Sequence, residues 1–86
     1  MHPALFSLVL AYQRDLNLLA KPRGLRQLYS ELGFSMGERQ LRNHHEWLIE
    51  REYIVLHRSS RGWRVELTEK GERFLRFLGL LKGVGL

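Results

Sequence analysis

"LRQLYSELGFSMGERQLRNHHEWL", residues 25–48, contains two helix-forming patterns that are separated by a short turn. The first pattern has apolar side chains at three- and four-residue steps: Leu25, Leu28, Tyr29 and Leu32. This spacing predicts a short helix with one apolar side. Gly33 follows directly, and glycine often ends a helix because it adopts a left-handed conformation without strain. We therefore expect a helix over residues 25–32.

The second pattern begins at Ser35, with Glu38 three residues later. This is a capping-box pattern, in which the Ser35 hydroxyl accepts from the Glu38 amide and the Glu38 carboxylate accepts from the Ser35 amide. We therefore expect a helix from Met36 to about Arg51. A turn of about three residues between a short helix and a longer one is typical of a helix-turn-helix.

The periodicity of the longer helix divides it into faces. Leu41, His45 and Leu48 are expected to face the core, because their spacing places them on one side. The opposite face carries polar side chains: Glu38, Arg39, Arg42, Asn43, Glu46 and Glu50. Gln40 and His44 lie on the flanks. The arginine side of this helix should therefore face solvent.

This polar stretch does not have the pattern of a metal site or a catalytic site. His44 and His45 are neighbours, about 100° apart around a helix, so their rings do not converge on one ion. A zinc-binding helix has histidines four residues apart with a glutamate between them. The sequence also lacks a serine, a histidine and a carboxylate at the spacing of a nucleophilic catalytic site. It has no glycine-rich phosphate-binding loop followed by a helix. We expect no metal, no cofactor and no enzymatic activity.

The segments on either side predict a further helix and a hairpin. Pro3 suits the first turn of a helix, and we expect this first helix over residues 1–20, ended by Pro22 and Gly24. Downstream, YIVLHR and WRVEL are rich in β-branched and aromatic residues and flank the turn SSRG. These two segments predict a β-hairpin.

The order of these elements, from Leu25 to Leu75, resembles the winged helix-turn-helix family. Three residues match the apolar positions of that family's recognition helix: Leu41, His45 and Leu48. Tyr53-Ile54 resembles the step into the first wing strand, and LTEKGERFL is similar to the wing-exit phrase L-T-x-x-G. The resemblance implies an α+β fold with a three-helix core, a two-stranded wing and an extra C-terminal helix, in a single domain over residues 1–86. In size the chain is similar to small prokaryotic or phage-encoded members.

The charge balance favours an anionic partner, with nucleic acid the first candidate. The chain has 14 Lys and Arg against 9 Asp and Glu, a net charge of +5. The resemblance implies that helix 36–51 enters the major groove and that wing 57–64 contacts the minor groove or the backbone. Arginine pairs with guanine, and asparagine or glutamine pairs with adenine. The predicted DNA-binding residues are Arg26, Ser35, Arg39, Gln40, Arg42, Asn43, Arg58, Arg61 and Arg64.

The function we expect is sequence-specific binding of double-stranded DNA by a dimeric transcriptional regulator. Two alternatives stay open. Arg39 and Arg42 could simply pair with neighbouring carboxylates, such as Glu46, on a solvated helix face. The chain could also be a winged-helix protein–protein interaction module that does not bind DNA.

The last predicted helix, residues 69–82, is capped by Thr68 and followed by Gly83 and Gly85. Its apolar side chains cover more than one face: Phe74, Leu75, Phe77, Leu78, Leu80 and Leu81. We expect the first and last helices to pair in a homodimer, because a domain this small cannot bury both faces alone. A basic helix lying on a membrane surface is the alternative.

Cysteine and leader patterns suggest a compartment. The 86 residues contain no cysteine, which excludes disulfides and thiolate metal sites. The apolar N-terminal segment lacks a basic n-region and a cleavage site and is interrupted at Gln13. We expect a cytoplasmic protein without a membrane partner.

Overall fold

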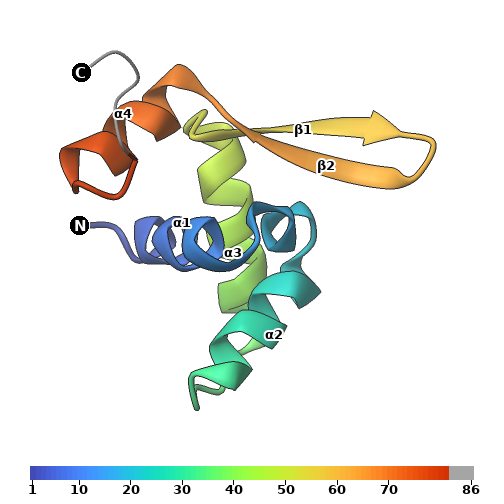
Figure 1. Ribbon diagram of the computed structural model, residues 1–86. Coiled ribbons are helices and arrows are strands. Elements are labelled where there is room, and N and C mark those ends of the chain that lie inside the picture. The colour runs from blue at the N-terminus through green and yellow to red at the C-terminus, as the bar shows by residue number, and fades with distance from the viewer. Residues whose placement is uncertain (82–86) are drawn as a thin grey trace.

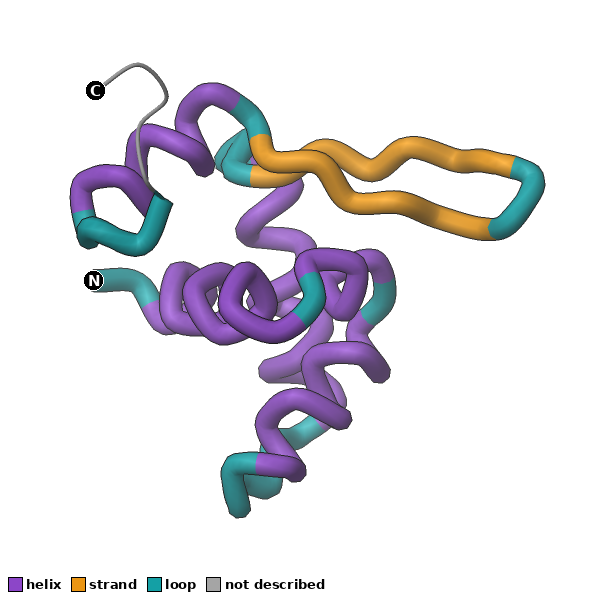
Figure 2. The backbone as a smooth tube through the Cα atoms, in the orientation of Figure 1, coloured by secondary structure: helices purple, strands orange, loops and turns teal. Residues whose placement is uncertain are grey.

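The computed structural model describes residues 1–81 as an α+β fold with four α-helices, one 3₁₀ helix and a two-stranded antiparallel sheet (Figure 1). The elements, in chain order, are α1 (Pro3–Arg14), η1 (Leu16–Ala20), α2 (Pro22–Glu31), α3 (Glu38–Glu50), β1 (Ile54–Ser59), β2 (Gly62–Leu67) and α4 (Glu69–Phe77). In Figure 1, α1 crosses α3, α2 lies below them, and the hairpin projects to one side. Figure 2 shows this hairpin as the longest extension from the helical body.

The first helix is shorter than the expected residues 1–20, because Asp15 interrupts it. Asp15 has an extended backbone, and its carboxylate accepts from the amide of Asn17 at 3.0 Å. This hydrogen bond caps the start of η1, and α1 ends before Asp15. Aspartate side chains often bond to nearby backbone amides in this way and so compete with helix formation. The apolar stripe therefore continues through two elements, and Leu19 of η1 is fully buried.

The second helix begins at Pro22, three residues before the predicted Leu25, so Pro22 and Gly24 lie inside this helix and not between two helices. Proline is compatible with the first helical position, where its missing N–H has no partner to lose. The other end matches the prediction. Gly33 has a φ of 85°, and the amide of Phe34 donates to the Tyr29 carbonyl at 2.9 Å. This is a Schellman ending.

The third helix begins two residues later than predicted, and the capping box does not form. Gly37, not Ser35, is the N-cap, and no side chain accepts a hydrogen bond there. The Glu38 carboxylate pairs with Arg26 of α2 at 3.2 Å instead of returning to the Ser35 amide. A tertiary ion pair has thus replaced a local capping contact.

The two strands form the predicted hairpin, with Ile54 opposite Leu67. Ser59 and Gly62, which the sequence placed in the turn, are the last pair of the strands. A side chain of η1 joins this hairpin to the helices. The Asn17 side-chain oxygen accepts from the backbone amide of Val65 at 2.9 Å. A two-stranded hairpin is marginal alone, so this contact, together with the buried Ile54, holds it on the body.

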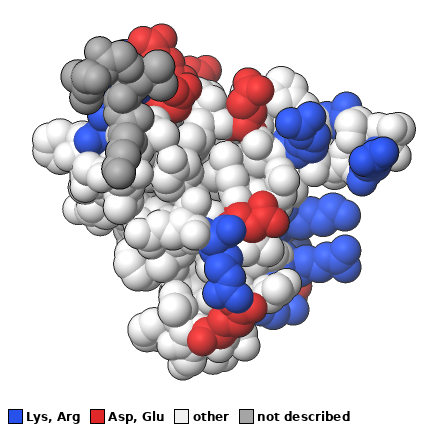
Figure 3. All heavy atoms as spheres, viewed as in Figure 1, with Lys and Arg blue, Asp and Glu red and all other residues white. Residues whose placement is uncertain are grey.

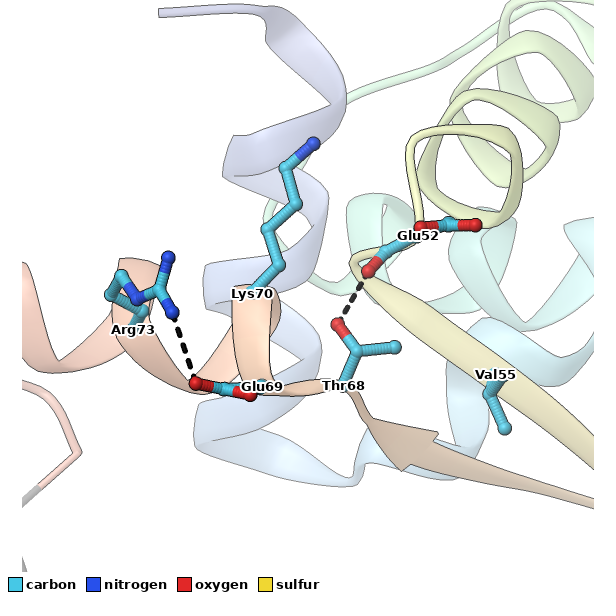
Figure 4. Close-up of a pocket in the computed structure, with 6 residues that line it drawn as sticks. All are labelled: Glu52, Val55, Thr68, Glu69, Lys70 and Arg73. Atoms are coloured by element: carbon cyan, nitrogen blue, oxygen red, sulfur yellow. Dashed lines mark hydrogen bonds and ion pairs between the residues drawn. The ribbon is translucent and has the colours of Figure 1, made fainter.

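Thr68 caps α4, as predicted, and accepts from the amide of Gly71 at 3.1 Å. Figure 4 shows the Thr68 hydroxyl directed at Glu52, whose carbonyl accepts its proton. Gly71 is required here, because a Cβ would lie 2.3 Å from the Tyr53 carbonyl oxygen. The helix ends at Phe77, before the predicted residue 82. The predicted stop at Gly83 and Gly85 lies outside the described residues.

The core lies where α1, η1, α2 and α3 meet, and β1 contributes its first residue. Its apolar members are Ala4, Leu5, Leu8, Ala11, Leu19, Leu25, Leu28, Tyr29, Leu41, Leu48 and Ile54. Fully burying one leucine contributes about 1.5–3 kcal/mol. Leu41 and Leu48 therefore fix the rotation of α3, which decides which of its side chains face outward.

Candidate nucleic-acid interface

The solvent face of α3 carries the arginines predicted for it. Leu41 and Leu48 are fully buried, while Arg39, Arg42 and Asn43 are exposed. Within residues 1–81, neither Arg39 nor Arg42 forms an ion pair of 4.0 Å or less. Pairing with Glu46 is thus not the arrangement found. The two guanidinium groups are available to an external partner.

The start of α3 and the middle of α2 are joined by the Arg26–Glu38 pair. Both side chains are exposed, at 53% and 72%, so the pair contributes little to stability. The Glu38 carboxylate offsets the charge of Arg26, which was predicted to contact DNA, so such a contact would require Arg26 to leave this pair. Gln40 and Ser35 are exposed beside this pair.

The hairpin carries three exposed arginines near its tip: Arg58, Arg61 and Arg64. Arg58 and Trp63 are cross-strand partners, and the Arg58 guanidinium carbon lies 5.8 Å from the centre of the Trp63 ring. Trp63 is 44% exposed, so it does not act as a buried hairpin anchor. Farther from the hairpin tip, Nε2 of His57 lies 3.5 Å from a carboxylate oxygen of Glu66.

Basic and acidic side chains are unevenly distributed over the molecule. In Figure 3, Lys and Arg side chains gather on the right, along and below the projecting hairpin, while acidic side chains gather near α4 at the top. Glu69 and Glu72 lie in the first turn of α4. A polyanion would therefore be attracted to the hairpin side of the molecule.

A buried polar network lies behind the exposed face of α3. The Ser7 hydroxyl is fully buried, 2.6 Å from the Tyr29 hydroxyl and 2.9 Å from Nδ1 of His44. Burial lowers the pKa of His44 below its ordinary value, and the nearby charge of His2 lowers it further. Burial raises the pKa of Tyr29, although its bond to Ser7 opposes that change. This network joins α1, α2 and α3.

His45 and Trp47 have structural contacts of their own. His45 is only partly buried, and its Nε2–H donates to the Ala20 carbonyl at 3.2 Å. The Trp47 ring stacks on the rings of His2 and Tyr53, with distances between ring centres of 3.9 Å and 5.5 Å. These contacts explain why a histidine and a tryptophan lie along the inner side of α3.

The structure adds two residues that sequence reasoning missed. Asn17 supports the hairpin through Val65, and Ser7 links two helices to α3. Neither has a sequence signal, because each partner is distant along the chain. An Asn soon after Asp15 and a Ser within an apolar helix are both common in surface or capping roles.

A second group of polar side chains includes charges that are already paired with each other. The hollow between β1 and the start of α4 is lined by Glu52, Val55, Thr68, Glu69, Lys70 and Arg73. There Arg73 is already paired with Glu69 at 3.0 Å (Figure 4). Within the described part of the chain, no three His, Asp or Glu side chains gather in a way that could hold a metal ion.

Among residues 1–81, no helix combines the length and the apolar character that a bilayer span requires.

No protein-family model matches this sequence, and neither does any curated protein or solved structure.

Proposed function

We propose that this chain is a winged helix-turn-helix protein that binds double-stranded DNA sequence-specifically and acts as a dimeric transcriptional regulator. In this proposal α2, the turn and α3 form the helix-turn-helix, and the β1–β2 hairpin is the wing. The observation that carries it is the pair Arg39 and Arg42, which are exposed on α3 and have no ion-pair partner within residues 1–81.

The chemistry of the α3 surface suits base edges in the major groove. An arginine can donate two parallel hydrogen bonds to O6 and N7 of guanine, and asparagine or glutamine can pair with adenine N6 and N7. Arg39, Arg42 and Asn43 supply these groups, with Gln40 beside them. Glu46 and Glu50 would repel phosphates, so the C-terminal half of α3 should stand away from the duplex.

The wing supplies charge rather than sequence information. Arg61 and Arg64 are exposed on a hairpin that projects past the helices (Figure 1). Each phosphate that such a group neutralises steepens the dependence of log affinity on log salt by about 0.9. Ser35 and Arg26, at the turn and on α2, are placed for backbone contacts in the same proposal.

A salt-titrated binding assay with selected duplexes tests this function. The Arg39→Ala/Arg42→Ala variant should lose discrimination between the selected and an unrelated sequence, because each good bidentate pair contributes about 1–3 kcal/mol. Arg61→Ala should weaken both duplexes alike and reduce the salt slope by about 1. Arg76→Ala, an equal charge change on α4, is the matched control and should affect neither.

A protein–protein interaction module is the second candidate, and exposed aromatic side chains favour it. Phe6 and Phe34 are 47% and 59% exposed and line a hollow of about 310 Å³ with Met36 and His44. The salt titration separates the two functions. No affinity for duplex DNA at low salt, or an affinity that does not change with salt, would favour the module.

A further inference from the structure

The two faces of the β1–β2 hairpin differ in what they contact. Side chains alternate along a strand, so the cross-strand pairs Ile54–Leu67, Leu56–Val65 and Arg58–Trp63 share one face. At the inner end of this face Ile54 is only 1% exposed, whereas Trp63 at the outer end is 44% exposed. The face that packs on the core thus continues past the core and ends in a partly exposed indole, with the Arg58 guanidinium over its ring.

The surroundings of Trp63 are basic and hollow. Between the hairpin tip and η1 there is a hollow of about 550 Å³, lined by Asn17, Ser59, Ser60, Arg61, Trp63 and Arg64. This volume lies within the range of about 300–1,000 Å³ that is usual for small-molecule sites. Arg58 lies across the strand from Trp63, and residues 57–65 contain no acidic side chain. The side chains that line this hollow include two arginines and no carboxylate. An exposed aromatic ring beside guanidinium groups complements a nucleotide, which has a π face and a phosphate.

We propose that Trp63, with Arg58 and Arg61, forms a stacking site for an unpaired nucleobase of a DNA strand. In intact duplex the face of each base is covered by its neighbours, so an indole can stack there only where a base has left the stack. Single-stranded nucleic acid is held in this way by aromatic side chains beside a positive groove. Guanidinium groups also contribute by stacking on rings.

This inference rests on the proposed DNA binding and narrows its substrate. The arginines on α3 would hold a duplex, while Trp63 at the tip of the hairpin would hold a base from an adjoining gap or opened region. The preferred substrate is therefore duplex DNA next to a short single-stranded stretch. Loss of one base–aromatic stack weakens binding by roughly 5- to 150-fold.

The test compares an intact duplex with a duplex of the same length and ends that has a gap of about six nucleotides in one strand. The Trp47→Phe protein is used, because the chain has two tryptophans and Trp63 is then the remaining emitter. We expect the gapped duplex to bind roughly 5- to 150-fold more tightly and to quench Trp63 fluorescence, whereas the intact duplex leaves the emission unchanged.

Variants at residue 63 complete the test. Trp63→Ala in the wild-type chain should abolish the preference for the gap and leave affinity for the intact duplex unchanged, while Trp63→Phe should retain part of the preference. Equal affinity for the two DNAs without quenching would overturn the stacking site and leave the proposed duplex binding standing. Binding of the gapped DNA alone would support stacking and contradict duplex recognition. Absence of binding to either DNA would overturn both.

Discussion

Glu52 has a backbone conformation that suits a different residue. It lies just after α3 with a φ of 61°, and the Tyr53 amide donates to the Leu48 carbonyl at 2.9 Å to complete a Schellman ending. Left-handed backbone costs a side-chain-bearing residue about 1–2 kcal/mol. Its carbonyl, not its carboxylate, accepts from Thr68, so the contact survives a change of side chain.

Glu52→Gly should therefore stabilise the fold by about 0.5–1 kcal/mol, the relief of strain being partly offset by the entropy that glycine adds to the unfolded chain. Glu50→Gly, two residues earlier in helical conformation, is the control and should destabilise by about 1 kcal/mol. Chemical denaturation measures both. A loss of stability at both positions would show that the strain at Glu52 is negligible.

His44 makes stability depend on pH near neutrality. Its pKa in the folded protein lies below 6.5, its ordinary value, because of burial and then the charge of His2. The unfolded chain therefore binds the proton more readily. Stability is fully present above pH 6.5 and falls as the pH decreases from 6.5 toward the folded pKa.

Urea denaturation between about pH 7.5 and 5.5, where carboxylates stay ionised, should show this loss. His44→Gln should flatten the profile, because glutamine can still hydrogen-bond Ser7 but does not titrate. A His44→Gln profile as steep as that of the wild type would assign the dependence to other groups.

At the scale of elements, the hydrogen bond from the Val65 amide to Asn17 joins the hairpin to η1. Asn17→Ala removes the acceptor for the Val65 amide and should cost about 1 kcal/mol. Exchange of the Val65 amide proton with solvent should accelerate, since that strand edge loses its partner. Asn43→Ala, at an exposed position on α3, is the control and should change stability by less than about 0.5 kcal/mol. Unchanged exchange at Val65 would mean that packing alone holds the hairpin.

Helix ends that depend only on neighbouring residues could be predicted from the sequence, whereas other helix boundaries could not. Gly33 and Thr68 act as the sequence indicated, because a left-handed glycine and a hydroxyl cap need only neighbouring residues. Ser35 did not become a cap: Gly37 is the N-cap, and the Glu38 carboxylate is paired with Arg26. Asp15 ended α1 although the apolar stripe continued, since periodicity reports burial and not the continuity of hydrogen bonds.

At the scale of the whole molecule, the proposed dimer has an exposed apolar residue to bury. Phe77 at the end of α4 is 85% exposed, and α4 lies on the same side of the molecule as the N-terminus (Figure 1). Two half-sites one turn of DNA apart would require the two α3 helices of such a dimer to lie about 34 Å apart. Phe77 is therefore the residue on which to test association.

Phe77→Glu should shift the protein from dimer to monomer in sedimentation experiments over a concentration series, because a carboxylate is costly to bury without a partner. Phe34→Glu makes the same change at another exposed phenylalanine, in the turn before α3, and should leave association intact. A wild-type chain that stays monomeric at every concentration, or a Phe77→Glu variant that dimerises equally well, would contradict the terminal-helix dimer.

The amino-acid sequence by itself determined the order of the four α-helices and the two strands and the rotation of α3, but not the 3₁₀ helix η1. Apolar periodicity and caps depend on residues a few positions apart, and Leu41 and Leu48 share one side of any helix they occupy. Only the tertiary structure decided which polar groups found internal partners. Glu38 reached Arg26, Asn17 reached Val65, and Arg39 and Arg42 were left without an ion pair within residues 1–81. Which partner each of these side chains finds depends on distances between elements that are far apart in the chain, and a pattern of neighbouring residues does not specify such distances.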